Sequence, residues 1–290
     1  MNLPSPLISA AALKERLALS NEQVVVMDAS MHLPTANRDA WQEHQDGHIP
    51  GAVFFDIDRI ADVSSELPHM LPSAAEFSDA VAQLGVGADS TVVVYDSHGL
   101  FSAARVWWMF TVFGHDKVLL LDGGLPAWQA IGAELESGIT QVGLAEKPIR
   151  AQLIKESVAS LQTVLDAVND ADGGARILDA RSKARFDAAA PEPRAGLRAG
   201  HMPGALSLPF TELLTTDNTD IIRLKPVDEI KAVFDAHGVQ PTDTVIASCG
   251  SGVTAAVLTL GLQLAGFKSG RLYDGSWVEW GSRSDTPIET

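Results

Sequence analysis

The chain of 290 residues repeats itself once, and this repeat constrains its architecture more than any local pattern does. Gly47-His48-Ile49-Pro50-Gly51-Ala52 returns 153 positions later as Gly200-His201-Met202-Pro203-Gly204-Ala205. Shorter markers return in the same order at nearly the same spacing: Asp28-Ala29 as Asp179-Ala180, Gly85-Val86 as Gly238-Val239, and Asp122-Gly123 as Asp274-Gly275. The repeat predicts a tandem duplication, with one domain at 1–138, a linker at 139–151 and a second domain at 152–290.

Short apolar runs alternate with helical patterns in both halves. Runs of this kind are typical of strands that are buried on both faces of a parallel sheet. They fall at 24–29, 52–55, 91–95 and 118–121 in the first half, and at 176–180, 205–208, 244–248 and 270–273 in the second. Ser73 followed by Glu76 predicts a capping box for a helix that ends near Gly85. We therefore expect an α/β fold made of two domains, each a mostly parallel sheet with helices on both faces.

Composition excludes several classes of function. The chain is 46% hydrophobic and 20% charged, which is typical of a folded globular protein, and it has no long apolar run that could cross a membrane. Its formal net charge of −16 disfavours binding to nucleic acid or to anionic lipid. The amino terminus lacks the basic and apolar regions of a targeting signal, so we expect a cytoplasmic protein.

The chain has a single cysteine, Cys249, which directly follows the expected strand 244–248. The loop Cys249-Gly250-Ser251-Gly252-Val253-Thr254 comes next, and then an apolar helical pattern at 255–264. Ligands of parallel α/β sheets bind at the carboxyl ends of strands, where backbone N–H groups and a helix N-terminus favour an anion. Thiols at helix N-termini also ionise more readily than free cysteine. Cys249 is therefore a candidate nucleophile rather than an inert buried cysteine.

Three kinds of chemistry use such an anion-binding loop. A cysteine-dependent phosphatase needs an arginine after five intervening residues, but position 255 is Ala. A dinucleotide site would use Gly250, Gly252 and Ala255 as G-x-G-x-x-A, but the motif lies too close to the end of the chain for a second half of a doubly wound sheet. The third chemistry is transfer of a sulfur atom that Cys249 carries as a persulfide, whose charge the loop would stabilise.

The sequence resembles the tandem-domain rhodanese-type sulfurtransferases over essentially its whole length. The resemblance rests on the cysteine loop, the two GH[IM]PGA segments, Arg105-Val106-Trp107-Trp108-Met109 and Asp274-Gly275-Ser276-Trp277-Val278-Glu279-Trp280. It implies that the first domain is catalytically silent, which agrees with Asp96 at the position that the repeat pairs with Cys249. The neutral loop is most similar to that of members that take sulfur from 3-mercaptopyruvate, whose negative charge lies far from its sulfur. Members that use thiosulfate, a dianion with its charge beside the transferred sulfur, commonly carry basic residues there.

The resemblance also implies roles for particular residues. Arg185 and Arg194 correspond to the arginines that hold the carboxylate and ketone oxygens of the substrate, and their planar forks suit a carboxylate. Gly250, Gly252, Val253 and Thr254 complete the binding loop. Ser251, Asp58 and His69 correspond to a catalytic proton relay, although the residues before His69 depart from the usual family pattern. Arg105, Arg181 and Arg198 do not match the substrate pair and are expected to be structural or solvent-facing.

We therefore expect a 3-mercaptopyruvate-dependent sulfurtransferase in which Cys249 forms a persulfide, releases pyruvate and passes the sulfur to cyanide or to a thiol such as thioredoxin. No cofactor is expected. His44 and His48 have helical spacing but no third ligand near them, so no metal is expected either. Three alternatives stay open: a thiosulfate:cyanide sulfurtransferase, a non-catalytic persulfide carrier and, more distantly, a nucleotide-binding oxidoreductase.

Overall fold

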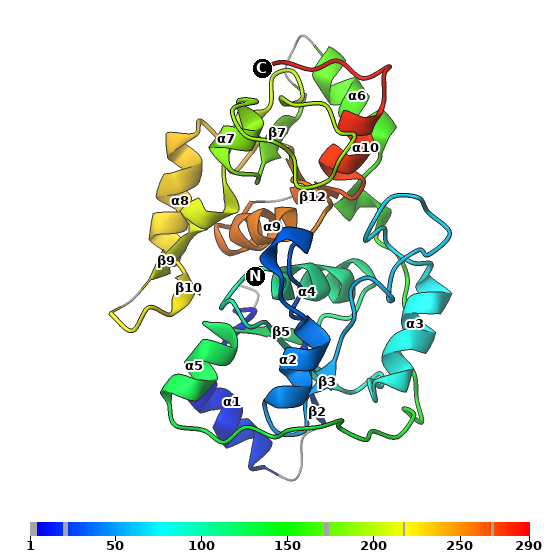
Figure 1. The fold of residues 1–290 in the computed structure, drawn as a ribbon, viewed down its shortest axis with the longest axis vertical. Helices are drawn as coiled ribbons and strands as arrows, with labels where there is room; N and C mark the ends of the chain where they lie inside the picture. Colours follow the sequence, from blue (N-terminus) through cyan, green and yellow to red (C-terminus); the bar gives the residue numbers. More distant parts are fainter. Residues whose placement is uncertain (1–4, 20–22, 171–173, 217, 268–269) are drawn as a thin grey trace. The chain divides into compact units, whose positions relative to one another are not determined.

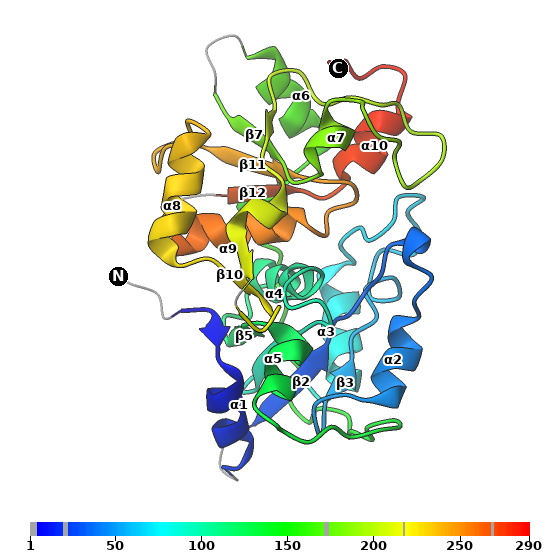
Figure 2. The same cartoon turned by 60° about the vertical axis from the view of Figure 1, so that its left-hand side comes forward.

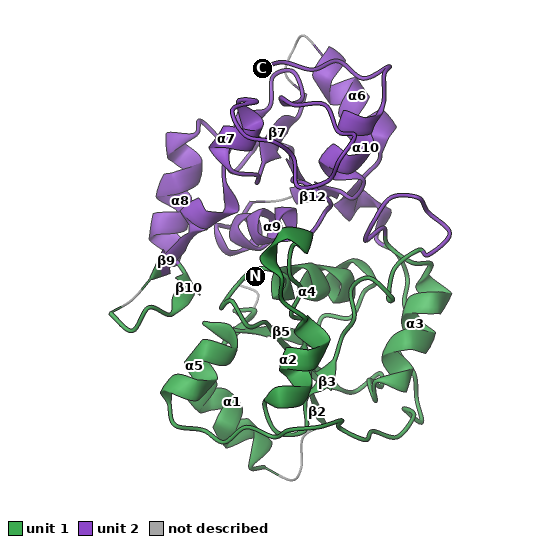
Figure 3. Cartoon of the chain, viewed as in Figure 1, with its two compact units in different colours: residues 1–62, 71–153, 216–224 green, residues 63–70, 154–215, 225–290 purple. Residues whose placement is uncertain are grey.

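The computed structural model describes residues 5–19, 23–170, 174–216, 218–267 and 270–290, and it divides into two compact units (Figure 1, Figure 3). Unit 1 comprises residues 1–62, 71–153 and 216–224, and unit 2 comprises residues 63–70, 154–215 and 225–290. Each unit therefore includes a short segment from the other half of the sequence. Within the part of the chain that the structure describes, no helix is long and apolar enough to cross a membrane.

Unit 1 contains a five-stranded parallel sheet in the order β1-β5-β4-β2-β3. Its strands are β1 (Leu7–Ile8), β2 (Val24–Asp28), β3 (Val53–Phe54), β4 (Thr91–Tyr95) and β5 (Val118–Leu121). Its helices are α1 (Ala10–Leu17), η1 (Pro34–Ala36), α2 (Ala40–Asp46), α3 (Ala74–Gln83), α4 (Ala103–Val112) and α5 (Gly124–Ala130). Leu13 of α1 and Trp128 of α5 pack with Val26 and Val93 in one core cluster, whereas Phe77 of α3 stacks on Phe113 at the end of α4.

Unit 2 repeats this plan, with a five-stranded parallel sheet in the order β6-β12-β11-β7-β8. Its strands are β6 (Val158–Ala159), β7 (Arg176–Asp179), β8 (Leu206–Ser207), β11 (Val245–Ser248) and β12 (Gly270–Tyr273). The helices are η2 (Lys155–Ser157), α6 (Leu161–Asn169), α7 (Lys183–Phe186), η3 (Phe210–Leu213), α8 (Val227–Ala236), α9 (Ala255–Leu264) and α10 (Ser276–Ser282). Figures 1 and 2 show α6 and α10 on one side of these strands and α8 and α9 on the other. Two further short strands are β9 (Leu214–Thr216) and β10 (Ile222–Leu224).

The expected fold class is confirmed: each half is a parallel sheet between helices, and the two strand orders match position by position. The capping box is also present, because the Ser73 hydroxyl accepts the Glu76 N–H at 3.2 Å and the Glu76 carboxylate accepts the Ser73 N–H at 2.8 Å. His44 and His48 lie in a buried network in which His44 contacts Asp28 at 3.0 Å and the His48 ring contacts the His44 carbonyl at 2.7 Å. This contact set agrees with a structural role for both histidines.

His115 predicts an acid sensitivity of unit 1. Its ring is buried and its Nε2 lies 3.1 Å from the Ser90 carbonyl, and burial lowers its pKa below the ordinary value of 6.5. Below about pH 6.5 the unfolded chain therefore binds a proton on His115 more readily than the native state does. The contribution of the buried neutral ring to stability is present above that pH and is lost as pH falls through the lowered pKa. We expect His115→Gln to show a shallower loss of urea resistance than the wild type between about pH 7 and pH 5. An equal loss in both proteins would contradict this prediction.

Candidate active site

Cys249 lies at the carboxyl end of β11, the central strand of the unit 2 sheet, as the sequence predicts. The residue is 2% exposed. The loop from Cys249 to Thr254 connects β11 to α9, and Gly252 has a φ of +76°, a conformation that favours glycine. The start of α10 closes the loop on its other side, because the Trp277 N–H donates to the Cys249 carbonyl at 3.0 Å and the Val278 N–H to the Gly250 carbonyl at 2.9 Å. The cysteine loop thus precedes the start of α9 and is hydrogen-bonded to the start of α10.

Ser276 is a site residue that the sequence analysis did not single out. Its hydroxyl oxygen accepts the N–H groups of Cys249 at 3.2 Å and Gly252 at 3.1 Å, and it lies 4.0 Å from the Cys249 Sγ. The hydroxyl in turn donates to the Tyr273 carbonyl at 2.8 Å. Ser276 is fully buried with a φ of +48°, which is uncommon for a residue other than glycine. Its position directly after the repeated Asp-Gly pair is the signal that could have identified it.

Four backbone amides of the cysteine loop remain available for an anion. Among the described residues, the N–H groups of Gly250, Ser251, Val253 and Thr254 donate to no protein acceptor. An array of N–H groups at the end of a parallel strand, ahead of a helix, binds negative charge. The loop can therefore stabilise a thiolate, or a persulfide that carries its charge one atom further out.

Unit 1 shows what the same loop does without a cysteine. Asp96 follows β4 directly and is fully buried. Its Oδ1 accepts the N–H groups of His98 at 2.9 Å and Gly99 at 3.0 Å, and its Oδ2 accepts those of Phe101 at 2.7 Å and Ala103 at 2.9 Å. The amide array of unit 1 is thus filled by a carboxylate of its own chain.

Arg185 lies beside the cysteine loop in unit 2. A Cβ added at Gly250 would lie 3.0 Å from the Arg185 Nη2, so the guanidinium rests against the loop backbone. The Arg185 side chain is 20% exposed and pairs with the carboxylate of Glu192. Glu192 also pairs with Arg181, whose side chain is 0% exposed. Burial lowers the pKa of Arg181, but Asp179 and Glu192 outweigh it and raise the pKa overall. Of the two roles expected for Arg181, structural or solvent-facing, the structure therefore supports the structural one.

Arg194 joins two other predicted site residues. Its Nη1 lies 3.4 Å from the Ser251 Oγ, and its Nη2 lies 3.0 Å from the His69 Nε2. Because a guanidinium only donates, this contact makes the Nε2 of His69 an acceptor. His69 is buried and has a φ of +62°. It belongs to the segment 63–70, so the structure assigns this residue of the first half of the sequence to unit 2.

Asp58, the remaining residue of the expected relay, belongs to unit 1. It is exposed and lines a hollow of about 300 Å³ together with Trp41, Phe54 and Arg38. The structure thus brings His69, Ser251 and Arg194 together within one unit, whereas Asp58 lies in the other.

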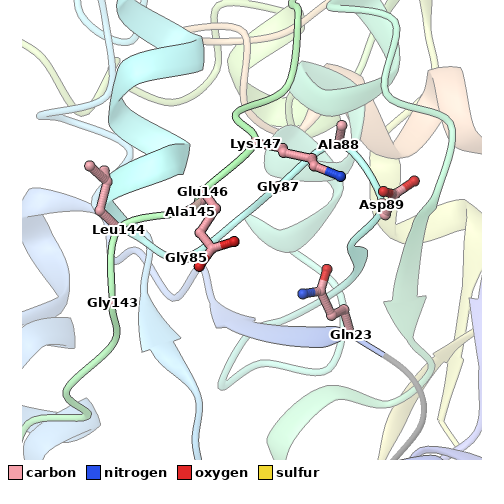
Figure 4. A pocket seen from close by; sticks show the side chains of 10 residues that line it. All are labelled: Gln23, Gly85, Gly87, Ala88, Asp89, Gly143, Leu144, Ala145, Glu146 and Lys147. Atoms are coloured by element: carbon pink, nitrogen blue, oxygen red, sulfur yellow. The ribbon is translucent and has the colours of Figure 1, made fainter.

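A second hollow in unit 1, of about 380 Å³, is not a candidate active site (Figure 4). It lies at the amino ends of β2 and β4, opposite the strand ends where parallel sheets bind ligands. Glycine and alanine backbone makes much of its wall, and its four polar side chains, Gln23, Asp89, Glu146 and Lys147, include no thiol, hydroxyl or imidazole. No group of three or more His, Cys, Asp or Glu residues that could hold a metal occurs among the described residues.

The chain belongs to the family of proteins with rhodanese-like domains. The model of the rhodanese-like domain matches it twice, at residues 9–131 and 160–283, and so covers most of both units. It is similar to the 3-mercaptopyruvate sulfurtransferase of Escherichia coli K12, with 45% identity over 93% of this chain and 94% of that protein. The human 3-mercaptopyruvate sulfurtransferase is 41% identical over 96% of this chain and 92% of its own length.

A solved structure leads to the same family. The crystal structure of the 3-mercaptopyruvate sulfotransferase SseA from Escherichia coli superposes with a TM-score of 0.83 at 42% identity, over 94% of this chain and 99% of that one. A relative from Arabidopsis thaliana carries both donors in its name, thiosulfate/3-mercaptopyruvate sulfurtransferase 1, mitochondrial, and is 43% identical over 94% of this chain and 75% of that protein. These relatives make the chain a sulfurtransferase that uses a small-molecule sulfur donor.

Proposed function

We propose that this protein is a 3-mercaptopyruvate sulfurtransferase in which Cys249 carries the sulfur. The observation that carries the proposal is the buried thiol of Cys249 in an uncharged amide loop, with Arg185 and Arg194 beside it. An uncharged loop suits a donor whose sulfur bears no neighbouring charge, and the arginines suit its carboxylate. The names of the relatives at 41% and 45% identity support the same donor.

In the first half-reaction, the Cys249 thiolate attacks the sulfur of 3-mercaptopyruvate. The bond between that sulfur and C3 of the substrate breaks, and its electron pair leaves with the carbon as the enolate of pyruvate. The proton of the substrate thiol passes to that carbon and completes pyruvate. The outer sulfur stays on Cys249 as a persulfide anion, which the amides of Gly250, Ser251, Val253 and Thr254 stabilise.

In the second half-reaction, an acceptor nucleophile attacks the outer sulfur and regenerates the Cys249 thiolate. Cyanide becomes thiocyanate, and a thiolate becomes a persulfide. Because Cys249 is the one cysteine of the chain, no internal disulfide can form. A dithiol protein such as thioredoxin would therefore release the sulfur as sulfide by oxidising its own pair of thiols. The covalent intermediate predicts ping-pong kinetics.

The proposal also assigns parts of the chain to roles. Residues 152–290 would form the catalytic domain, 139–151 the linker and 1–138 the catalytically silent domain, in which Asp96 replaces the nucleophile. Ser251, His69 and Asp58 would form the proton relay that delivers the proton to the leaving enolate, and the contacts of Arg194 with Ser251 and His69 support the first two. The protein would act in the cytoplasm.

A comparison of sulfur donors tests this function. We expect the kcat/KM of the purified protein for 3-mercaptopyruvate to be at least about tenfold above its kcat/KM for thiosulfate. The reason is that 3-mercaptopyruvate has a carboxylate for the two arginines to bind, whereas thiosulfate has none. Pyruvate and thiocyanate are measured in parallel, with cyanide as the acceptor. A preference for thiosulfate would assign the protein to that donor instead, and a persulfide without pyruvate release or turnover would make it a sulfur carrier.

A further inference from the structure

The proposed reaction uses Arg185 but leaves open what holds its guanidinium beside the cysteine loop. Glu192 lies between the two substrate arginines in the sequence, as part of Pro191-Glu192-Pro193. Its side chain is only 3% exposed, and a buried carboxylate requires charged or hydrogen-bonding partners. Glu192 has two of them, one on each oxygen.

One oxygen of Glu192 binds Arg185 and the other binds Arg181. The Oε2 accepts from the Nε of Arg185 at 3.2 Å and from its Nη2. The Oε1 accepts from the Nη1 of Arg181 at 2.7 Å. Glu192 is therefore a bridge between two guanidinium groups, and the position of Arg185 depends on the position of Arg181.

Arg181 is held rigidly by the sheet. Its Nε and Nη2 donate to both oxygens of Asp179, the last residue of β7, at distances of 2.6 to 3.0 Å. Its Nη2 also donates to the Gly200 carbonyl at 2.8 Å, and its guanidinium lies 4.1 Å from the centre of the Trp277 ring. The series of contacts Asp179–Arg181–Glu192–Arg185 thus connects the end of β7 to the residue beside Gly250.

The edge of the Arg185 guanidinium that Glu192 occupies decides whether Arg185 can still bind a ligand. Glu192 occupies the side edge, formed by Nε and Nη2. The Nη1 of Arg185 donates to no partner among the described residues, so the end edge, formed by Nη1 and Nη2, remains open to a ligand. A carboxylate can bind two N–H groups of that end edge in parallel. Glu192 therefore orients the fork without taking the place of a substrate.

We propose that Glu192 is a positioning residue that sets the affinity for the carboxylate of the sulfur donor by fixing Arg185 on the anchored guanidinium of Arg181. This role rests on the proposed function, because it concerns the same substrate. Glu192 does not contact the reacting sulfur, and it acts only through Arg185.

Two substitutions test the role. Glu192→Gln keeps the shape but loses the charge-assisted pairing, and we expect the KM for 3-mercaptopyruvate to rise about tenfold, with kcat changed less than about threefold. Glu192→Asp keeps the charge that offsets Arg181 but is one methylene too short to hold both guanidinium groups, so it should raise KM in the same way in a protein that folds normally. Asp187→Asn is the matched control, since Asp187 pairs with the exposed Lys183 in the same segment, and its KM should equal that of the wild type.

A double-mutant cycle separates this role from general damage. In the background of Arg185→Lys, which lacks the fork, adding Glu192→Gln should change KM less than about twofold. The inference would be overturned if the effects of Arg185→Lys and Glu192→Gln on KM multiplied. It would also be overturned if Glu192→Gln lowered KM, because Glu192 would then have competed with the substrate.

Binding of pyruvate separates failure of the inference from failure of the proposed function. Calorimetric titration of pyruvate into Cys249→Ser, with and without Glu192→Gln, needs no turnover. We expect the second substitution to weaken pyruvate binding about tenfold. Equal affinities, or no measurable binding to either protein, overturn the positioning role, whereas a wild type that releases no pyruvate from 3-mercaptopyruvate overturns the proposed function.

Discussion

Cys249→Ser is expected to abolish sulfur transfer, with pyruvate release from 3-mercaptopyruvate reduced at least roughly a thousandfold. A hydroxyl in the place of the thiol is a far weaker nucleophile at neutral pH and cannot hold the transferred sulfur as a persulfide. Pyruvate release under saturating donor is the first measurement, and intact mass after addition of the donor alone is the second.

The mass measurement is unusually direct for this chain. Since Cys249 is the one cysteine, a gain of one sulfur atom by the wild type assigns the persulfide to that residue without peptide mapping. The adduct should disappear on treatment with dithiothreitol, and Cys249→Ser should show none. An adduct of equal yield on the serine variant, or its absence from the wild type, would contradict every persulfide mechanism for this protein.

Asp96→Ala is expected to lower the free energy of unfolding by about 3 to 5 kcal/mol, because it leaves four buried or partly buried amides without their acceptor. The donors are the N–H groups of His98, Gly99, Phe101 and Ala103, each within 3.0 Å of the carboxylate. Urea unfolding measures the global effect. Hydrogen exchange measures the local one, since these four amides should lose protection.

Asp89→Ala provides the control for Asp96→Ala. The Asp89 side chain is 77% exposed and lies 3.8 Å from Lys117, so its removal should change the free energy of unfolding by less than about 0.5 kcal/mol. Equal stabilities of the two variants would show that the carboxylate of Asp96 does not hold its loop.

The elements with strong local signals could be predicted from the sequence. Buried apolar runs identified β4 and β5 at their observed bounds, and the Ser73–Glu76 pair identified the start of α3. The two-residue strands β1 and β6 were missed. They are too short to show a pattern, and their pairing with β5 and β12 alone makes them strands.

Site residues could be predicted where the order of strand, loop and helix along the sequence places them, but not where contacts in the folded structure place them. Cys249 could be placed because it ends a strand and begins a loop before a helix. Ser276 has a sequence signal only in its place after the repeated Asp-Gly pair, and Glu192 has none, because their contacts, Ser276 with Cys249 and Glu192 with Arg185, form only in the fold. The repeat identified Asp96 as the counterpart of Cys249, but only the hydrogen bonds show that its carboxylate fills the loop.

The assignment of segment 63–70 to unit 2 has an evolutionary consequence. A gene that kept only the second repeat would encode Cys249, Ser251 and Arg194 but would lose His69, the histidine that Arg194 contacts. A gene shortened in this way would therefore not encode all of the unit that holds Cys249.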